Sequence, residues 1–122
     1  MVRISDSELE VMKVIWEKKE TTSVEIIEAL KDFNWNFNTT RTLIKRLLVK
    51  GAIEIVKKEG KTYTYRSAID ENEYKNFVTK ALLKKLYNDS LVEFALDYCK
   101  NGEVSKREVK QVIREICEMM ED

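Results

Sequence analysis

The sequence predicts a mainly helical fold with a small β-hairpin: a winged helix-turn-helix domain over residues 1–69, followed by a helical dimerisation region over residues 70–122. First, the 122-residue chain has no proline and only three glycines, which leaves few breaks in long helices. Second, apolar residues recur at helical spacing through most of the chain. Third, residues 53–66 have strand-like composition around a glycine-bearing turn.

Two capping boxes, each a Ser or Thr followed three residues later by Glu, open the first two predicted helices at Ser5 and Thr22. The first helix is expected over about residues 6–19. The second is shorter and is expected to end near Asp32. The apolar stripe of the first helix consists of Leu9, Met12, Ile15 and Trp16. Trp16 is therefore expected in the core, and Trp35 is expected to staple the start of the third helix.

The third helix, residues 36–51, is expected to have two faces, with Asn36 as its cap and Gly51 at its end. The packing face holds Thr40, Leu43, Ile44 and Leu47. The candidates for contact with base edges are Asn38, Thr39, Arg41, Thr42 and Lys45. The candidates for phosphate contact on this helix are Arg46 and Lys50. Arg and Asn carry paired hydrogen-bonding groups that match bases in a major groove, so this pattern is typical of a DNA recognition helix, with Arg41 as the strongest guanine candidate.

A β-hairpin is predicted next, from strands at Ile53–Val56 and Thr62–Arg66. The turn between them contains Lys57, Lys58 and Lys61, which we interpret as the phosphate-contacting tip of a wing. The alternative is that these lysines serve solubility and protect the sheet edge. Tyr63 and Tyr65 are expected to pack on one face of the sheet.

The charge distribution favours a double-stranded DNA partner although the net charge is zero. Residues 36–66 carry a net charge of +6, whereas residues 1–35 and 67–122 carry −3 each.

The chain has no His, no Gly-rich phosphate loop and no nucleophile with a base at a recognisable spacing. We therefore expect neither an enzyme nor a cofactor.

The last third of the chain is expected to dimerise. Asp70, Ser90 and Ser105 each open a capping box followed by an apolar stripe, but three such short helices cannot readily bury their own apolar surface. The candidate dimerisation residues are Leu91, Phe94, Tyr98, Val109, Val112, Ile113, Ile116 and Met120. A two-fold homodimer would place two recognition helices on a pseudo-palindromic operator.

Cys99 and Cys117 are expected to be buried thiols, with a redox pair as the alternative. With no His in the chain, these two residues are not expected to form a metal site within one subunit.

No run of eighteen apolar residues occurs, and the amino terminus lacks the apolar core of a signal peptide. The sequence therefore predicts a cytoplasmic protein without membrane insertion.

Three segments, ISDSELEVMKVIWE, WNFNTTRTLIKRLLVKGAI and KKEGKTYTY, together with the capped helices that follow, resemble the penicillinase repressor family, the BlaI/MecI/CopY group. The resemblance covers essentially the whole chain. It implies a dimeric winged-helix repressor of antibiotic-resistance or copper-homeostasis genes, with a DNA operator and a membrane sensor-protease as upstream regulator. It also implies proteolytic inactivation near Asp97-Tyr98, where the β-lactam-responsive branch has Asn-Phe.

This chain departs from the family at three places. It lacks the Cys-x-Cys signature of the copper-responsive branch, has Asp97-Tyr98 at the cleavage position, and has Asn36-Phe37 where the recognition helix usually begins with Ser-Pro. Net neutrality leaves two other functions open: a winged-helix module for protein interaction, or a regulator that responds to a small ligand.

Overall fold

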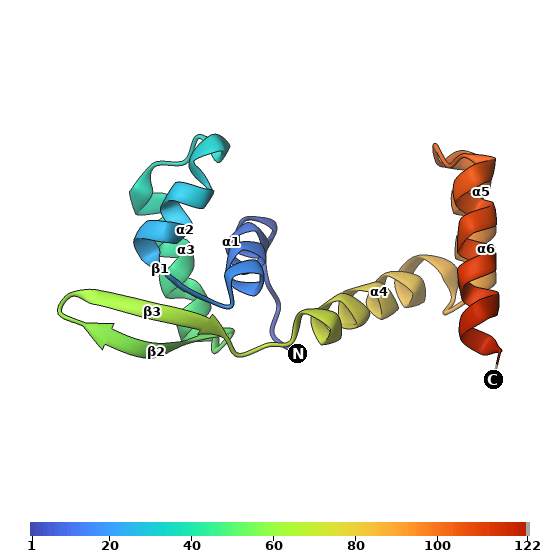
Figure 1. Ribbon diagram of the computed structural model, residues 1–122. Helices are drawn as coiled ribbons and strands as arrows, with labels where there is room; N and C mark the ends of the chain where they lie inside the picture. Colours follow the sequence, from blue (N-terminus) through green and yellow to red (C-terminus); the bar gives the residue numbers. More distant parts are fainter. Residues whose placement is uncertain (122) are drawn as a thin grey trace. The chain divides into compact units, whose positions relative to one another are not determined.

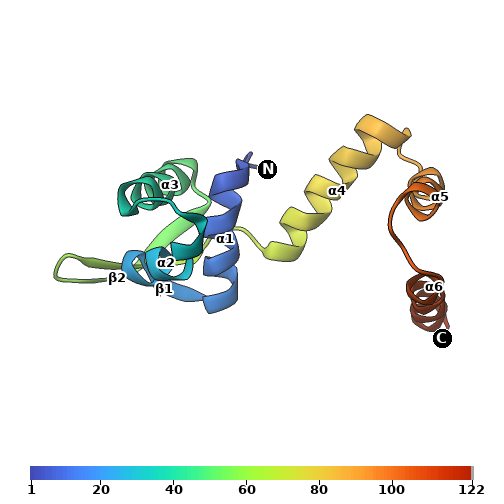
Figure 2. The ribbon, with the colours of Figure 1, turned by 90° about the horizontal axis from the view of Figure 1, so that it is seen from above.

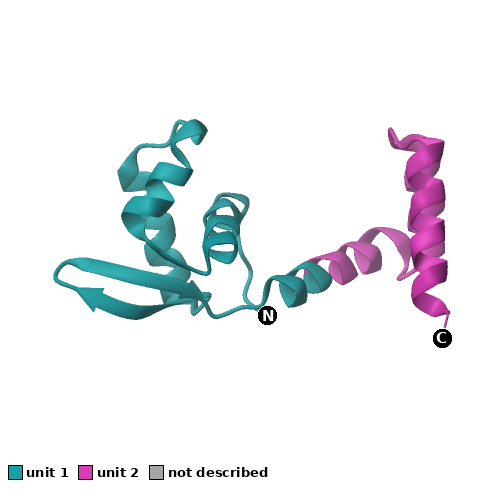
Figure 3. Cartoon of the chain, viewed as in Figure 1, with its two compact units in different colours: residues 1–77 teal, residues 78–122 magenta. Residues whose placement is uncertain are grey.

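The computed structural model describes residues 1–121 and confirms the mainly helical fold with a small sheet (Figure 1). In chain order the elements are α1 (Asp6–Lys18), β1 (Glu20–Thr22), α2 (Ser23–Ala29), the 3-10 helix η1 (Lys31–Phe33), α3 (Phe37–Lys50), β2 (Ile53–Glu59), β3 (Thr62–Ser67), α4 (Glu71–Tyr87), α5 (Leu91–Asn101) and α6 (Lys106–Met120). Contacts divide the chain into two compact units, residues 1–77 and 78–122 (Figure 3). No helix within residues 1–121 is both long and apolar enough to cross a membrane.

Both predicted capping boxes at the start of the chain are present. The Ser5 and Thr22 hydroxyls accept from the backbone N–H groups of Glu8 and Glu25, and each glutamate carboxylate accepts from the cap residue's N–H. The second helix is shorter than expected, because α2 ends at Ala29 and the chain continues as η1. The sequence pattern did not separate this 3-10 turn from the helix before it.

The sheet has three antiparallel strands in the order β1-β3-β2. The strand β1, which the sequence did not predict, places Thr21 opposite Tyr65. The hairpin is also longer than predicted. A register shift between Ile55 and Lys57 lets β2 continue, so that Lys57 lies opposite Thr64 and only Gly60 and Lys61 form the turn. Its tip projects beyond α1, α2 and α3 in both views (Figures 1 and 2).

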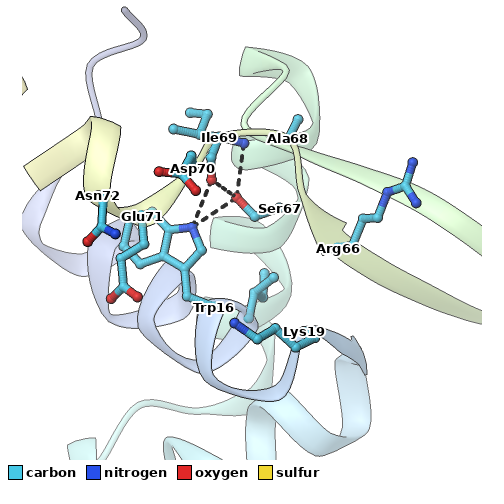
Figure 4. Close-up of a pocket in the computed structure, with 10 residues that line it drawn as sticks. Trp16, Lys19, Arg66, Ser67, Ala68, Ile69, Asp70, Glu71 and Asn72 are labelled. Carbon is cyan, nitrogen blue, oxygen red and sulfur yellow. Dashed lines mark hydrogen bonds between the residues drawn. The ribbon is translucent and has the colours of Figure 1, made fainter.

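Trp16 is a core residue, as predicted, and it joins α1 to the segment after the sheet. Its indole N–H donates to the Ile69 carbonyl at 2.9 Å and to the Ser67 hydroxyl at 3.0 Å (Figure 4). Its ring lies 5.8 Å from the ring of Tyr74 in α4. These contacts keep the first turns of α4 with the winged domain, and the division between the two units therefore falls inside α4. The boundary expected from sequence, at residues 69 and 70, lies just before this helix.

A buried carboxylate links the start of α1 to the last turn of α3. Glu8 is 1% exposed, and its Oε1 accepts from the Ser5 N–H at 2.8 Å and from the ammonium of Lys50. Lys50 also donates to the Arg3 carbonyl at 2.9 Å. Burial raises the pKa of Glu8, but hydrogen bonds from Lys50 and Ser5 and the charge of Lys50 outweigh it and lower the pKa below its ordinary value.

In the second unit, α5 and α6 contain no buried residue. Aromatic contacts occur there: Phe94 lies edge-on to Tyr87 at 5.3 Å and tilted to Tyr98 at 6.0 Å. The expectation that these helices cannot bury their own apolar stripes within one chain is therefore confirmed.

The ion pair of Glu8 predicts a specific dependence of stability on acidity. Because the folded-state pKa lies below the ordinary value of 4.5, the stabilisation is complete above that pH and is lost as the pH falls through the folded-state pKa. Urea unfolding between pH 7 and pH 3 should therefore show a decline in the free energy of unfolding that Glu8→Gln makes shallower. Glu17→Gln is the control, because Glu17 is exposed on the same helix, and it should leave the slope unchanged. Equal slopes for wild type and Glu8→Gln would contradict this assignment.

Candidate nucleic-acid interface

The helix α3 divides into a buried face and an exposed face, as predicted. The buried residues are Thr40, Leu43, Ile44 and Leu47. The exposed polar residues are Asn38, Thr39, Arg41, Thr42, Lys45, Arg46 and Lys50. The Asn36 side chain caps the first turn by accepting from the Thr39 N–H at 2.9 Å, and Gly51 ends the helix in the left-handed conformation at φ +77°. Both ends of α3 are therefore fixed by their own sequence.

The exposed polar side chains of α3 differ in what they leave free. The Thr42 hydroxyl donates to the Asn38 carbonyl at 2.9 Å, and the Thr39 hydroxyl donates to the Asn36 carboxamide at 3.3 Å. Within residues 1–121, Arg41 takes part in no ion pair, and its guanidinium lies over the Phe37 ring at 5.5 Å from the centroid. All five N–H donors of Arg41 are thus available to an outside partner.

A surface depression of about 470 Å³ connects α3 to the hairpin. It is lined by Ser23, Arg41, Ile44, Lys45, Leu48, Lys61 and Tyr65. Burial and the neighbouring Tyr63 raise the pKa of Tyr65, and the charge of Arg41 partly opposes this shift, consistent with a guanidinium near the depression. Three cationic side chains from two elements therefore surround one hollow. That arrangement suits an anionic backbone next to a base edge.

The three lysines of the predicted wing are not equivalent. Lys57 donates to Glu59 at 2.8 Å, and this hydrogen bond and the opposite charge raise the pKa of Lys57 and lower that of Glu59. The ammonium of Lys58 lies 5.4 Å from the Tyr63 ring centroid. Lys61 pairs with no carboxylate in the described part of the chain. Of the three lysines, Lys57 is thus the one that pairs with a carboxylate within residues 1–121, and Lys58 and Lys61 have no ion pair there.

Lys50 has a different environment from the one expected. Its ammonium is held by Glu8 and the Arg3 carbonyl on the side of α3 that faces α1, so Lys50 also has a structural role that the sequence did not predict. The helical spacing predicted that Lys50 lies at the flank of α3. It could not reveal the pairing with Glu8, because that carboxylate lies 42 residues away in the sequence. Arg46 remains exposed.

In the second unit the predicted dimerisation residues lie on an exposed apolar surface. A groove of about 780 Å³ runs between α5 and α6. It is lined by Phe94, Ala95, Leu96, Tyr98, Cys99, Val104, Glu108, Val109, Val112, Ile113 and Ile116. Leu96 and Val104 also line this groove, although the sequence pattern did not single them out. Leu91 and Met120 are exposed outside this groove.

The burial predicted for Cys99 and Cys117 was wrong, since both thiols are exposed. Each lies on a helix that holds no buried residue in the described part of the chain. The expected cleavage position also lies in this unit. The Asp97-Tyr98 bond is inside α5, and the Asp97 carboxylate accepts from the Tyr87 hydroxyl and the Asn101 side-chain amide, both at 2.9 Å. The first of these bonds raises the pKa of Tyr87.

Comparison with known proteins agrees with this geometry. The model of the penicillinase repressor family matches residues 4–118. The penicillinase repressor of Bacillus licheniformis is 36% identical over 111 residues, which are 90% of this chain and 86% of the relative. The methicillin resistance regulatory protein MecI of Staphylococcus aureus (strain N315) is 34% identical over 110 residues, 89% of each chain.

A solved structure is similar to the winged part. The solution structure of the monomeric form of Bacillus licheniformis BlaI in complex with the blaP half-operator is 42% identical, with a TM-score of 0.51. It covers 59% of this chain and 88% of that one. Both of the relatives above are named as regulators: one as a repressor and the other as a regulatory protein. This chain therefore belongs to the penicillinase repressor family.

Proposed function

We propose that this protein is a transcriptional repressor that binds a duplex DNA operator as a homodimer. The observation that carries the proposal is the division of α3 into a face buried in the core and a face of exposed polar and cationic side chains. A rigid helix with one free polar face is the element that winged-helix proteins insert into a major groove. The similarity to BlaI bound to a half-operator supports the same use here.

The side chains have separate roles in this proposal. Arg41 donates in bidentate fashion to a guanine, and the neighbouring base-edge contacts come from Asn38, Thr39, Thr42 and Lys45. Phosphates are contacted by Arg46 and by the hairpin lysines Lys57, Lys58 and Lys61. The net charge of +6 over residues 36–66 supplies the long-range attraction to a polyanion. Lys50 is a weaker phosphate candidate, because Glu8 already pairs with its ammonium.

The homodimer is proposed to form through the region of residues 70–122. The groove between α5 and α6 exposes apolar side chains such as Val112, 54% exposed, and Ile113, 56% exposed. Apolar patches of this kind on a soluble chain mark association surfaces. A second copy that covers them would give two recognition helices related by a two-fold axis, which matches an operator with pseudo-palindromic half-sites.

The relatives named for penicillinase and methicillin resistance suggest that the regulated genes confer resistance. Because the proposed partner is DNA, we propose a cytoplasmic location. A membrane sensor-protease is the proposed upstream regulator. Cleavage at Asp97-Tyr98 is the matching hypothesis for inactivation. Because this bond lies inside α5, a protease must first unwind part of the helix.

A protein-interaction module or a small-ligand regulator is the alternative function. A depression of about 400 Å³ beside Trp16, Lys19 and Arg66 is the feature that a small ligand would use (Figure 4). A salt series of binding to duplex DNA separates these functions, because phosphate contacts make affinity fall steeply as salt rises. Negligible affinity for duplexes selected from a random pool, even in low salt, would favour the protein-interaction module.

Arg41→Ala should weaken binding to the selected operator by about 1–3 kcal/mol and weaken binding to unrelated duplex much less, because only the operator offers the guanine. Fluorescence anisotropy with both duplexes measures the two affinities. Equal losses on both duplexes would show that Arg41 contacts phosphate alone.

The double variant Lys58→Gln/Lys61→Gln should weaken binding to every duplex alike and reduce the slope of log affinity against log salt by about 1 for each lysine removed. Lys57→Gln is the matched control from the same hairpin. Since Glu59 already pairs with Lys57, this variant should change the slope less. A larger effect of Lys57→Gln would reverse the assignment.

Ile113→Glu should convert the dimer to a monomer, because it places a carboxylate in the apolar groove between α5 and α6. Sedimentation velocity measures the change in mass. Lys110→Glu introduces the same group at an exposed position of α6 outside that groove and should leave the dimer intact. A wild-type monomer, or an Ile113→Glu dimer of unchanged stability, would refute this interface.

A further inference from the structure

We propose that Phe37 is a specificity-determining residue, which positions the Arg41 guanidinium for its base contact without touching the base itself. This inference rests on the proposed DNA-binding function. Phe37 is the first residue of α3, it is 54% exposed, and it belongs neither to the core nor to the apolar residues packed against the core. A large ring in this place contributes little to the folding of the winged domain.

The ring has a partner one turn later on the same helix. Residues four apart in a helix are neighbours on its surface, and the guanidinium carbon of Arg41 lies 5.5 Å from the Phe37 ring centroid. That distance is within the range in which a cation is attracted by the face of an aromatic ring. The ring is therefore a platform beneath the guanidinium.

The surroundings of Arg41 make this platform important. Within residues 1–121 no carboxylate pairs with Arg41, so no ion pair restricts its long side chain. An arginine loses much rotamer freedom when its guanidinium is fixed against a base. The ring restricts the guanidinium before binding and offers no lone pair that competes for its N–H donors. Phe37 thus reduces the ordering that DNA must impose and leaves the donors available.

A double-mutant cycle tests this role. The probe is the duplex selected by the wild-type protein, beside a copy in which the guanine sensed by Arg41 is replaced by 7-deazaguanine. Phe37→Leu keeps an apolar side chain but removes the ring face, and should lower the preference for the guanine duplex by about 2- to 5-fold. Phe37→Tyr keeps the face and should restore the preference. In the Arg41→Ala background, Phe37→Leu should have no effect on it.

Two results would overturn the proposal. A loss of affinity on Phe37→Leu that is the same with and without Arg41 would mean that the ring contacts DNA directly. An unchanged preference in Phe37→Leu would mean that the ring has no part in recognition. Val24→Ala is the matched control, since Val24 is an exposed apolar residue of α2, and it should leave the preference unchanged.

A measurement on the free protein separates failure of this inference from failure of the proposed function. If the Phe37 ring lies beneath the guanidinium in solution, the side-chain protons of Arg41 experience its ring current, and their upfield NMR shift disappears in Phe37→Leu. Absence of this shift in the wild type overturns the positioning role even if the operator is bound. Absence of any selected duplex, with the shift present, overturns the DNA-binding function and with it the role of the ring in recognition.

Discussion

The arrangement of the winged domain depends on one buried carboxylate. Glu8 accepts hydrogen bonds from the Ser5 N–H at the start of α1 and from the Lys50 ammonium at the end of α3, so one side chain joins two helices through residues 42 positions apart in the sequence. Separating them would remove the only cation that pairs with a carboxylate of 1% exposure in the described residues, and breaking such a pair is strongly destabilising. The carboxylate therefore acts with the apolar core shared by the two helices to hold α3 against α1.

The two halves of the chain use exposed surface in different ways. In the first unit, the polar face of α3 and the hairpin lysines form a cationic surface above a complete core. In the second unit, α5 and α6 bury nothing by themselves and expose their apolar side chains. A folded domain can tolerate exposed charge alone in water, whereas an exposed apolar groove favours association. This difference is the physical basis for proposing DNA contact by one unit and dimerisation by the other.

Local patterns predicted the elements well, and long-range pairing explains the differences. The capping boxes at Ser5 and Thr22, the core position of Trp16 and the two faces of α3 all follow from spacing along the chain. The strand β1 was missed because three residues carry no period of their own and gain strand geometry only from pairing with β3. Helical spacing also does not reveal that Lys50 pairs with the distant Glu8. Nor does it reveal that both thiols are exposed.

If the exposed face of α3 contacts bases as proposed, the hydroxyl of Thr42 limits which bases it can accept. Its proton already serves the Asn38 carbonyl, as the proton of Thr39 serves Asn36. Toward the groove each of these threonines offers only oxygen lone pairs and a methyl group. Such groups favour the amino groups of adenine or cytosine and the methyl of thymine, whereas the neighbouring guanidinium can only donate. Along one turn of α3, hydroxyl oxygens that accept hydrogen bonds therefore alternate with a guanidinium that donates them.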